Sequence, residues 1–476
     1  MGQTIIASPE VFSPAYNPLK FIVDSTNKSK AGFKYIFQVY EAGTTNKIAE
    51  YKQLPTFGDG YGEQDMSKLI QSKVSWDLNT SSTSWYNAPN SRYLYDVKVG
   101  EEYTYQITYV SNLTNNGGNV QINVSNIFNV GDQVVIAQTD GGVANPQLDG
   151  LHTVTASSGS AFTVNVAWST ITSASIDGTV RFADNRKLII LGLALFNDQI
   201  GFNGAFRWTD WSTYDSADYK LTNANKQWLT NQPQQFSCTL AEDLYLNLRS
   251  PKGHDRIVFV NSNGATFYKA ISNADEISQV PVGPNNYGTL VGTGALIDST
   301  VTWYDVYYRT AAGVESVKYR INLDRRESIT EYDILFLDRL GSYSSFAFQL
   351  KSYERGEITR EIFNKDVKGY VNTNDNWTYN TEDMGFTQLN LNVVKSMDLN
   401  TNFMTQEMAQ YFEELLTSPQ TFIKSVEYIC GEGPVSSTYQ PCIIQNNTYE
   451  VFKQRNKNLI KQSITIKLSN QDNING

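Results

Sequence analysis

The sequence predicts a mainly β protein of several domains, and three observations support this. With 476 residues the chain is too long for one ordinary hydrophobic core. Charged residues make up only 18%, whereas 29 Tyr and 23 Phe accompany many Asn, Thr and Ser, a composition that favours half-buried pleated strands over helices. Short segments of alternating apolar and polar residues, separated by Gly, Pro and Asn turns, recur along the chain.

Residues 1–110 together with 185–230 are predicted to form a first β-sandwich. In FKYIFQVYEAGTTNKIAEYKQLP, apolar and polar residues alternate from Phe33 to Val39, and a Gly-containing turn and a returning strand follow. With RYLYDVKVGEEYTYQITYV, this pattern is typical of an immunoglobulin- or fibronectin-like sandwich.

Residues 111–184 differ in composition from the segments around them, since they are rich in Val, Asn, Thr and Gly and have almost no Lys or Glu, and they are predicted to be an insertion. NIFNVGDQVVIAQTDGG, LDGLHTVTASSGSAFTVNV and GTVRF describe short strands separated by Gly and Asp turns, enough for a small β-barrel. A loop tolerates such an insertion because the entropic cost of loop length grows only logarithmically.

Residues 231–325 are predicted to form a second β-sandwich. DRIVFVNS, ATFYKAIS, VTWYDVYYRT and VESVKYRINL alternate as strands of a sheet with one solvated face do. Clusters such as VPVGPNNYG separate them as turns.

Residues 326–476 are predicted to be a β-rich C-terminal domain with one amphipathic helix near 404–417. Thr405 is placed to cap this helix, and Ser418 and Pro419 to end it. SITIKLS, near the end of the chain, is predicted to be an edge strand. The apolar stripe of the helix consists of Met404, Met408, Tyr411, Phe412, Leu415 and Leu416.

Charge and hydropathy argue against nucleic acids and membranes as partners of the chain. The net charge of -10 and the pI near 4.9 argue against sequence-independent nucleic-acid binding, which needs an excess of Lys and Arg, and we expect no sequence-specific nucleic-acid partner either. The N-terminus lacks the pattern of a signal peptide, and the longest apolar run, Leu188 to Phe196, has about half the length that spans a bilayer. We therefore expect a soluble chain made in the cytoplasm, without membrane insertion.

The chain offers little for catalysis. Its two histidines, His152 and His254, fall in different predicted domains, and the three cysteines have no metal-ligand spacing, so we expect a protein that is not an enzyme and has no cofactor or metal. The three cysteines, Cys238, Cys430 and Cys442, leave at least one thiol unpaired; Cys430 and Cys442 could face each other across a hairpin, although two reduced, packed thiols are the favoured state. A pair of carboxylates that hydrolyses glycans stays open, because their separation is a three-dimensional property.

One cluster has the residue types of a binding site. Aromatic rings stack on sugars and carboxylates bind sugar hydroxyls, which makes a glycan site one interpretation. The favoured alternative is that the rings fill a domain junction or a subunit interface. The cluster comprises Trp208, Asp210, Trp211, Tyr214 and Asp215.

Several segments resemble virion proteins of crAss-like and related phages that infect Bacteroidetes. They are FKYIFQVYEAG, RKLIILGLALFNDQIGFNGAFRWTDW, KQWLTNQP, YDILFLDRLGSYSSFAF, EELLTSPQTFI and NNTYEVFKQRNKNLIKQSITIKLSNQ, in the expected order. In the insertion, VGDQVVI, LDGLHTVTA and FTVNV resemble the small SH3-like barrels of phage structural proteins. The matching motifs are structural, so no catalytic residue is carried over.

The resemblance implies a structural component of the phage tail, a connector or baseplate protein located in the virion. It would form a ring-like homo-oligomer with sixfold or twelvefold symmetry, contact other tail, portal or baseplate proteins and help guide DNA exit. A receptor- or glycan-binding tail protein is the alternative, with the Trp208 to Asp215 cluster as its contact surface.

Overall fold

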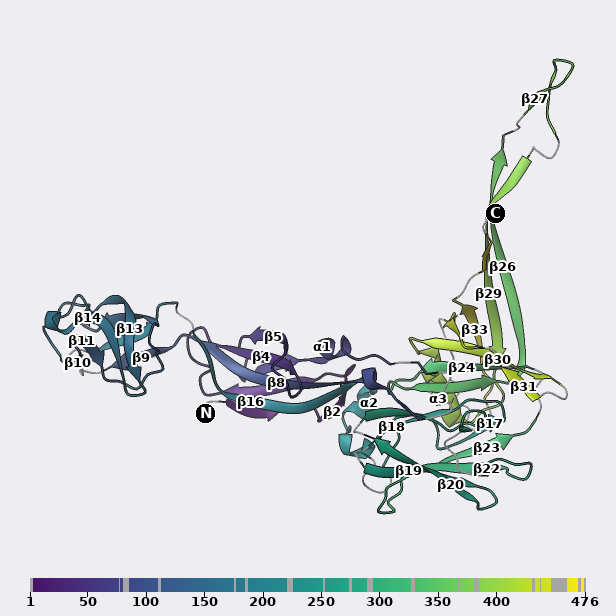
Figure 1. Ribbon diagram of the computed structural model, residues 1–476, viewed down its shortest axis with the longest axis horizontal. Coiled ribbons are helices and arrows are strands. Elements are labelled where there is room, and N and C mark those ends of the chain that lie inside the picture. The colour runs from purple at the N-terminus through teal and green to yellow at the C-terminus, as the bar shows by residue number, and fades with distance from the viewer. Residues whose placement is uncertain are drawn as a thin grey trace. The chain divides into compact units, whose positions relative to one another are not determined.

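The computed structural model confirms a mainly β protein built from several sheets (Figure 1). It divides into two compact units, described separately below. Unit 1 comprises Met1–Ser13, Pro18–Ile70 and Leu94–Gly201, and unit 2 comprises Pro14–Asn17, Gln71–Tyr93 and Phe202–Gly476. The structure describes residues 3–76, 78–79, 85–109, 113–174, 177–184, 187–220, 226–250, 253–273, 276–288, 294–326, 330–366, 369–380, 385–429, 433–436, 438–446, 460–469 and 472–474.

Unit 1 contains a three-stranded sheet of order β1-β3-β6 and a five-stranded sheet of order β2-β16-β8-β4-β5. The ring of Phe21 packs edge-on against Phe196 and Tyr95, with centroids 4.8 and 6.3 Å away. The elements are β1 (Gln3–Ala7), β2 (Phe12–Pro14), β3 (Lys20–Ser25), β4 (Lys34–Glu41), β5 (Lys47–Gln53), β6 (Gly62–Asp65), α1 (Ser67–Gln71), β8 (Arg92–Tyr103) and β16 (Lys187–Phe202).

A seven-stranded sheet of order β10-β11-β14-β13-β12-β15-β9 also belongs to unit 1 and has a core of its own. Strand β13 pairs with β12 through its first half and with β14 through its second half. Phe128 is central to the core, with Phe162 and Phe182 at 5.0 and 4.8 Å. The elements are β9 (Gln106–Tyr109), β10 (Leu113–Asn116), β11 (Asn119–Ile122), β12 (Gln133–Gln138), β13 (Gly150–Ser158), β14 (Ala161–Ala167), η2 (Trp168–Thr170) and β15 (Gly178–Phe182).

Two sheets of unit 2 share one core and form a sandwich. One has the order β17-β23-β22-β19-β20, with β17 parallel to β23, and the other has the order β18-β21-β7. Tyr304 of β22 donates a hydrogen bond of 2.7 Å to the carbonyl of Val282, and Trp228 is fully buried between the sheets. The elements are β7 (Tyr86–Asn87), η1 (Pro89–Ser91), α2 (Trp208–Trp211), η3 (Ser216–Tyr219), β17 (Gln235–Thr239), β18 (Tyr245–Ser250), β19 (Gly253–Asn261), β20 (Thr266–Asn273), β21 (Glu276–Pro281), β22 (Trp303–Arg309) and β23 (Tyr319–Asp324).

A nine-stranded sheet with one helix completes unit 2. Its order is β25-β24-β30-β32-β33-β29-β26, with β31 on β30 and β34 on β29. The helix α3 packs Phe412 against Phe346, 5.1 Å between ring centroids. The elements are β24 (Thr330–Leu337), β25 (Tyr343–Phe348), β26 (Leu350–Lys365), β27 (Tyr370–Val371), β28 (Trp377–Thr378), β29 (Gly385–Asn400), α3 (Gln406–Leu416), β30 (Thr421–Ile429), β31 (Gly433–Ser436), β32 (Gln440–Ile444), β33 (Ser463–Leu468) and β34 (Asp472–Ile474).

Strands β26 and β29 continue past this sheet as a two-stranded ribbon. They pair from Leu350–Asn400 to Lys365–Gly385, whereas β33 reaches only Ser396–Asn400 of β29 and β34 only Leu391–Val393. Figure 1 shows them as long adjacent arrows that lead to the β27–β28 hairpin. We call residues 350–365 with 385–400 the ribbon.

The predicted helix is confirmed, because α3 spans Gln406–Leu416 and the Thr405 hydroxyl accepts a bond of 3.3 Å from the Met408 amide. Two shorter helices, α1 and α2, were not predicted, since neither has room for an apolar stripe. The edge assignment of SITIKLS is wrong, because β33 lies between β32 and β29. In the described part of the chain, no helix is both long enough and apolar enough to cross a membrane.

The four predicted domains are a finer division than the two units, and they stay a prediction. The units place residues 202–230 with the later part of the chain, whereas the sequence grouped them with the first domain. The immunoglobulin-like and SH3-like assignments of individual domains stay predictions as well.

Candidate functional site

The predicted aromatic cluster lies on α2 and between α2 and η3, within unit 2. Trp211 and Tyr214 stack at 5.3 Å with 27° between their planes, and Tyr219 continues the stack at 6.0 Å and 23°. Phe206 packs against Tyr214 at 4.8 Å. Trp208 is 71% exposed. The structure thus brings together two of the three predicted rings and adds Tyr219 and Phe206, which the sequence analysis missed.

The two predicted carboxylates of the cluster have local hydrogen-bond partners. Asp215 caps η3 by accepting a bond of 2.8 Å from the Ala217 amide. Asp210 accepts from the Thr209 hydroxyl at 3.1 Å. Burial, followed by the charges of Asp218 and Asp210, raises the pKa of Tyr219 to about 12, so its hydroxyl keeps its proton at neutral pH. Both carboxylates are exposed and keep acceptor capacity for a ligand.

A pocket of about 260 Å³ adjoins this cluster and is lined by Phe206, Arg207 and Asp210 together with residues far along the chain. Arg207 and Arg339 both lie 3.6 Å from the buried carboxylate of Glu414. The pocket therefore combines aromatic carbon, two cations and carboxylates, which are the groups that bind a polar ring compound.

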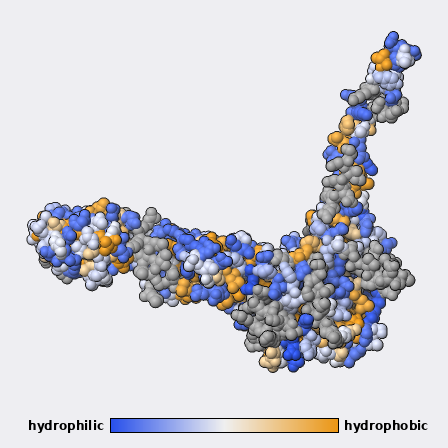
Figure 2. Space-filling view, viewed as in Figure 1, coloured by the Kyte–Doolittle hydropathy of each residue, from blue (hydrophilic) through white to orange (hydrophobic). Residues whose placement is uncertain are grey.

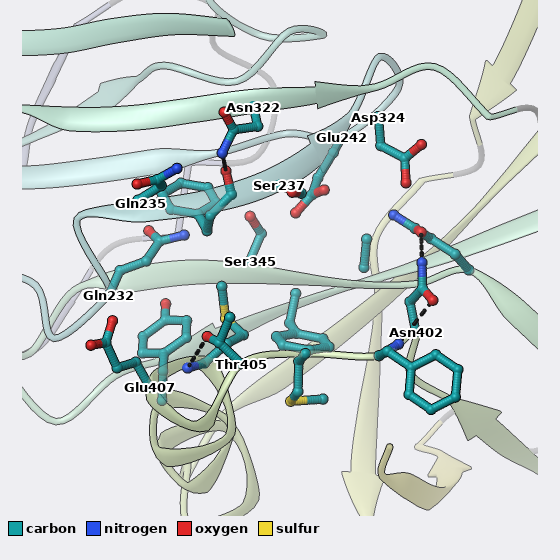
Figure 3. A pocket seen from close by; sticks show the side chains of 18 of the residues that line it. Gln232, Gln235, Ser237, Glu242, Asn322, Asp324, Ser345, Asn402, Thr405 and Glu407 are labelled. Atoms are coloured by element: carbon teal, nitrogen blue, oxygen red, sulfur yellow. Dashed lines mark hydrogen bonds between the residues drawn. The ribbon is translucent and has the colours of Figure 1, made fainter. Parts of the chain in front are cut away.

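A larger cleft of about 480 Å³ lies between β17 and α3 and is also lined by β25 (Figure 3). Figure 3 shows Gln235 and Asn322 on one side and Asn402 and Glu407 on the other. Polar side chains of the cleft form hydrogen bonds with one another. For example, the side-chain amide of Asn402 donates a hydrogen bond of 3.2 Å to the side-chain oxygen of Gln349. Burial raises the pKa of the Glu242 carboxyl well above its usual range, and nearby Asp333 and Glu331 act in the same direction.

A buried ionic network lies in the same unit and was not predicted. Lys424 of β30 pairs with Asp243 and lies 3.9 Å from the carboxylate of Asp333 on β24, and the three side chains are 4%, 8% and 2% exposed. The Tyr439 hydroxyl bonds to Asp333 at 3.3 Å. Burial raises the pKa of Asp333 to about 7, although the Lys424 charge opposes this. The network joins β24, β30 and the segment after β17.

The thiol of Cys238 on β17 lies beside the Glu242 carboxyl of the larger cleft. His152 contacts the Leu148 carbonyl at 2.9 Å in unit 1, and the His254 side chain lies outside the described part of the chain. Cys238 and Cys442 are buried free thiols, and Cys430 lies outside the described residues. Among the described residues no group of three or more His, Cys, Asp or Glu is arranged to hold a metal ion.

The ribbon exposes several large apolar side chains. Cross-strand partners share a face of a two-stranded ribbon, so the ladder assigns Ile358, Ile362, Phe386, Leu391 and Val393 to one face. Ile362 is 61% exposed and Phe386 is 75% exposed. Figure 2 shows hydrophobic residues among hydrophilic ones along this ribbon. The hairpin beyond it also exposes Trp377 and Val371.

A scan of protein-family models finds no match to the chain, and a search of curated proteins finds no matching sequence.

Proposed function

We propose that the chain is a structural component of a bacteriophage tail, which assembles into a ring-like homo-oligomer with other tail, portal or baseplate proteins. The resemblance of its segments to virion proteins of crAss-like phages supports the phage assignment. The proposal assigns the chain an assembly role in the virion without a catalytic step.

The exposed ribbon is the observation that carries the assembly role. An isolated two-stranded hairpin is marginally stable in water, and a long edge strand with exposed apolar residues invites pairing with another chain. Almost every residue of β26 is exposed, including Ile358, Ile362 and Phe363. Such a surface is favourable when a neighbouring subunit covers it.

The acidic charge fits a path for DNA. A net charge of -10 repels the phosphate backbone, so an assembly of this chain around a passage would let DNA slide rather than bind. This argument supports the proposed help in DNA exit.

The test is to find the protein in particles. Virions of a phage that encodes this chain can be purified from an infected Bacteroidetes culture, and mass spectrometry is expected to find the chain in them at a fixed copy number. Electron microscopy of the same particles is expected to place it in a tail ring. Purified virions that lack the chain, or that carry it as single copies, would refute the proposal.

A glycan- or receptor-binding tail protein is the second candidate, because the stacked rings of Trp211, Tyr214 and Tyr219 adjoin a pocket with Arg207 and Asp210. On an array of host glycans, binding by the full chain is expected to be lost with Trp211→Ala. It is expected to persist with Trp377→Ala, a matched change at an exposed Trp of the hairpin. No binding by the unaltered chain would exclude the array's glycans as ligands.

A further inference from the structure

We propose that the ribbon joins neighbouring copies of this chain head to tail. In this arrangement the free edge of β26 in one copy pairs antiparallel with the free part of β29 in the next copy. The inference rests on the proposed self-assembly and specifies the element that makes the contact.

The ribbon has two free edges of different kinds. Among the described strands, β26 has no strand partner on its outer edge from Leu350 to Asn364, because its ladder is with β29 alone. On β29 the outer edge is covered at Leu391–Val393 by β34 and at Ser396–Asn400 by β33, so Gly385–Asn390 is the part that no described strand covers. Lys365 pairs with Gly385 and Glu361 with Asn390 within one copy, so the free part of β29 lies level with the last residues of β26.

Two unlike edges on one element favour a second copy as the occupant. Each copy offers one edge and accepts the other, so the contact repeats by rotation and can close into a ring. Because β26 and β29 are antiparallel within a copy, ribbons related by rotation about an axis along the strands also meet as antiparallel neighbours.

The charges agree with this pairing. Residues 360–365 of β26 carry Arg360, Glu361 and Lys365, whereas residues 385–390 of β29 carry no charge, so no like charges face each other across the contact. The ribbon as a whole has five cations and four acids, which keeps it near neutral in a chain of net charge -10. A copy of the same ribbon is therefore not repelled as the rest of the chain would be.

The apolar faces set the register. If Ile362 lies opposite Phe386 of the neighbouring copy, the apolar faces of the two ribbons become continuous, and two of the most exposed large apolar side chains of the ribbon cover each other. The same register places Glu361 opposite Thr387 of the neighbouring copy. A slip by one residue would turn the apolar face of one ribbon to the polar face of the next.

Cysteine cross-linking of the full chain tests the pairing. Glu361→Cys and Thr387→Cys, prepared as separate single variants and mixed under mild oxidation, are expected to give disulfide-linked dimers only in the mixture. The unaltered chain under the same oxidation controls for the native thiols. Dimers formed by Glu361→Cys alone would instead show two β26 edges meeting by a twofold axis and would overturn the head-to-tail pairing.

The mass of the assembly, measured by light scattering across concentrations, separates this inference from the proposed function. Ile362→Asp is expected to raise the apparent dissociation constant at least about tenfold. Leu54→Asp, the same kind of change at a leucine that is 69% exposed outside the ribbon, is expected to leave it unchanged. Oligomers that neither cross-link in the mixture nor respond to Ile362→Asp would overturn the ribbon contact and leave self-assembly standing. A chain that stays monomeric throughout would contradict the pairing, and the particle experiment alone would then decide the proposed function.

Discussion

Replacing Lys424 by Met tests whether the buried ionic network of unit 2 holds its strands together. Lys424 is the cation between Asp243 and Asp333, and all three side chains are at most 8% exposed. Loss of one partner of a buried ion pair typically costs about 3–5 kcal/mol, because the remaining charge stays desolvated. We therefore expect Lys424→Met to lower the free energy of unfolding by about 3–5 kcal/mol at pH 7.5.

The same network predicts the pH dependence of this loss. Without the Lys424 charge, which lowers the pKa of Asp333, the Asp333 carboxyl holds its proton still more tightly in the folded than in the unfolded chain. Stability of the variant should then rise as the pH falls from about 8 to about 5, because the folded state binds more protons over this range. The deficit relative to the unaltered chain should shrink accordingly.

Urea unfolding followed by Trp fluorescence and circular dichroism at pH 5, 6.5 and 8 measures both effects. Lys318→Met, which breaks an exposed pair with Glu315 in the same unit, is the control and should stay within about 0.5 kcal/mol of the unaltered chain. The triple variant Lys424→Met, Asp243→Asn, Asp333→Asn should recover at least half of the loss, since no buried charge is left unpaired. A cost of Lys424→Met below about 1 kcal/mol, or a triple variant no better than the single one, would refute the reasoning.

Three further predictions concern unit 2. Gly341→Ala should destabilise by at least about 3 kcal/mol in thermal unfolding, because Gly341 has a φ of 81° and a methyl group there would overlap the Asn203 carbonyl oxygen; an unchanged melting temperature would contradict this. Burial raises the pKa of Asp338 from 3.8 to about 7, so the folded chain binds this proton more tightly than the unfolded chain does. Its contribution to stability should fall as the pH rises from about 4 to about 7, and Asp338→Asn should flatten this part of the urea midpoint profile; an unaltered profile would disprove the assignment. Thr405→Ala should cost about 1 kcal/mol in urea unfolding by removing the N-cap of α3, whereas Thr405→Ser should cost little, and equal effects of the two would argue against capping.

Alternating patterns predicted strands well, because they report that one face of a strand is buried. They do not report which neighbour pairs with each edge, and this explains the wrong edge assignment of β33, which has a partner on both sides. The ribbon was not predicted for the same reason, because the sequence does not report which strands pair. Nothing in the sequence of β26 indicates that β29 is its sole neighbour among the described strands.

Whether a candidate site could be predicted from the sequence depends on how far apart its residues lie along the chain. Trp211 and Tyr214 are three residues apart, so local turns bring them together and the sequence could suggest their cluster. Arg339 and Glu414 complete the adjoining pocket from far along the chain, and no local pattern places them there. The ionic network is hidden for another reason, since a charged residue in an alternating strand predicts a solvated face, whereas Lys424 is buried between two acids.

The parallel ladder between β17 and β23 has a consequence for synthesis on the ribosome. The first strand of this sheet, Gln235–Thr239, cannot complete its pairing until Tyr319–Asp324 has emerged, and β21 needs Tyr86–Asn87 from much earlier in the chain. Contacts so distant along the chain slow folding, because the loops between them must close first. The apolar strands of this sandwich therefore stay exposed during synthesis. We expect the yield of native protein to depend on chaperones and on a low synthesis temperature.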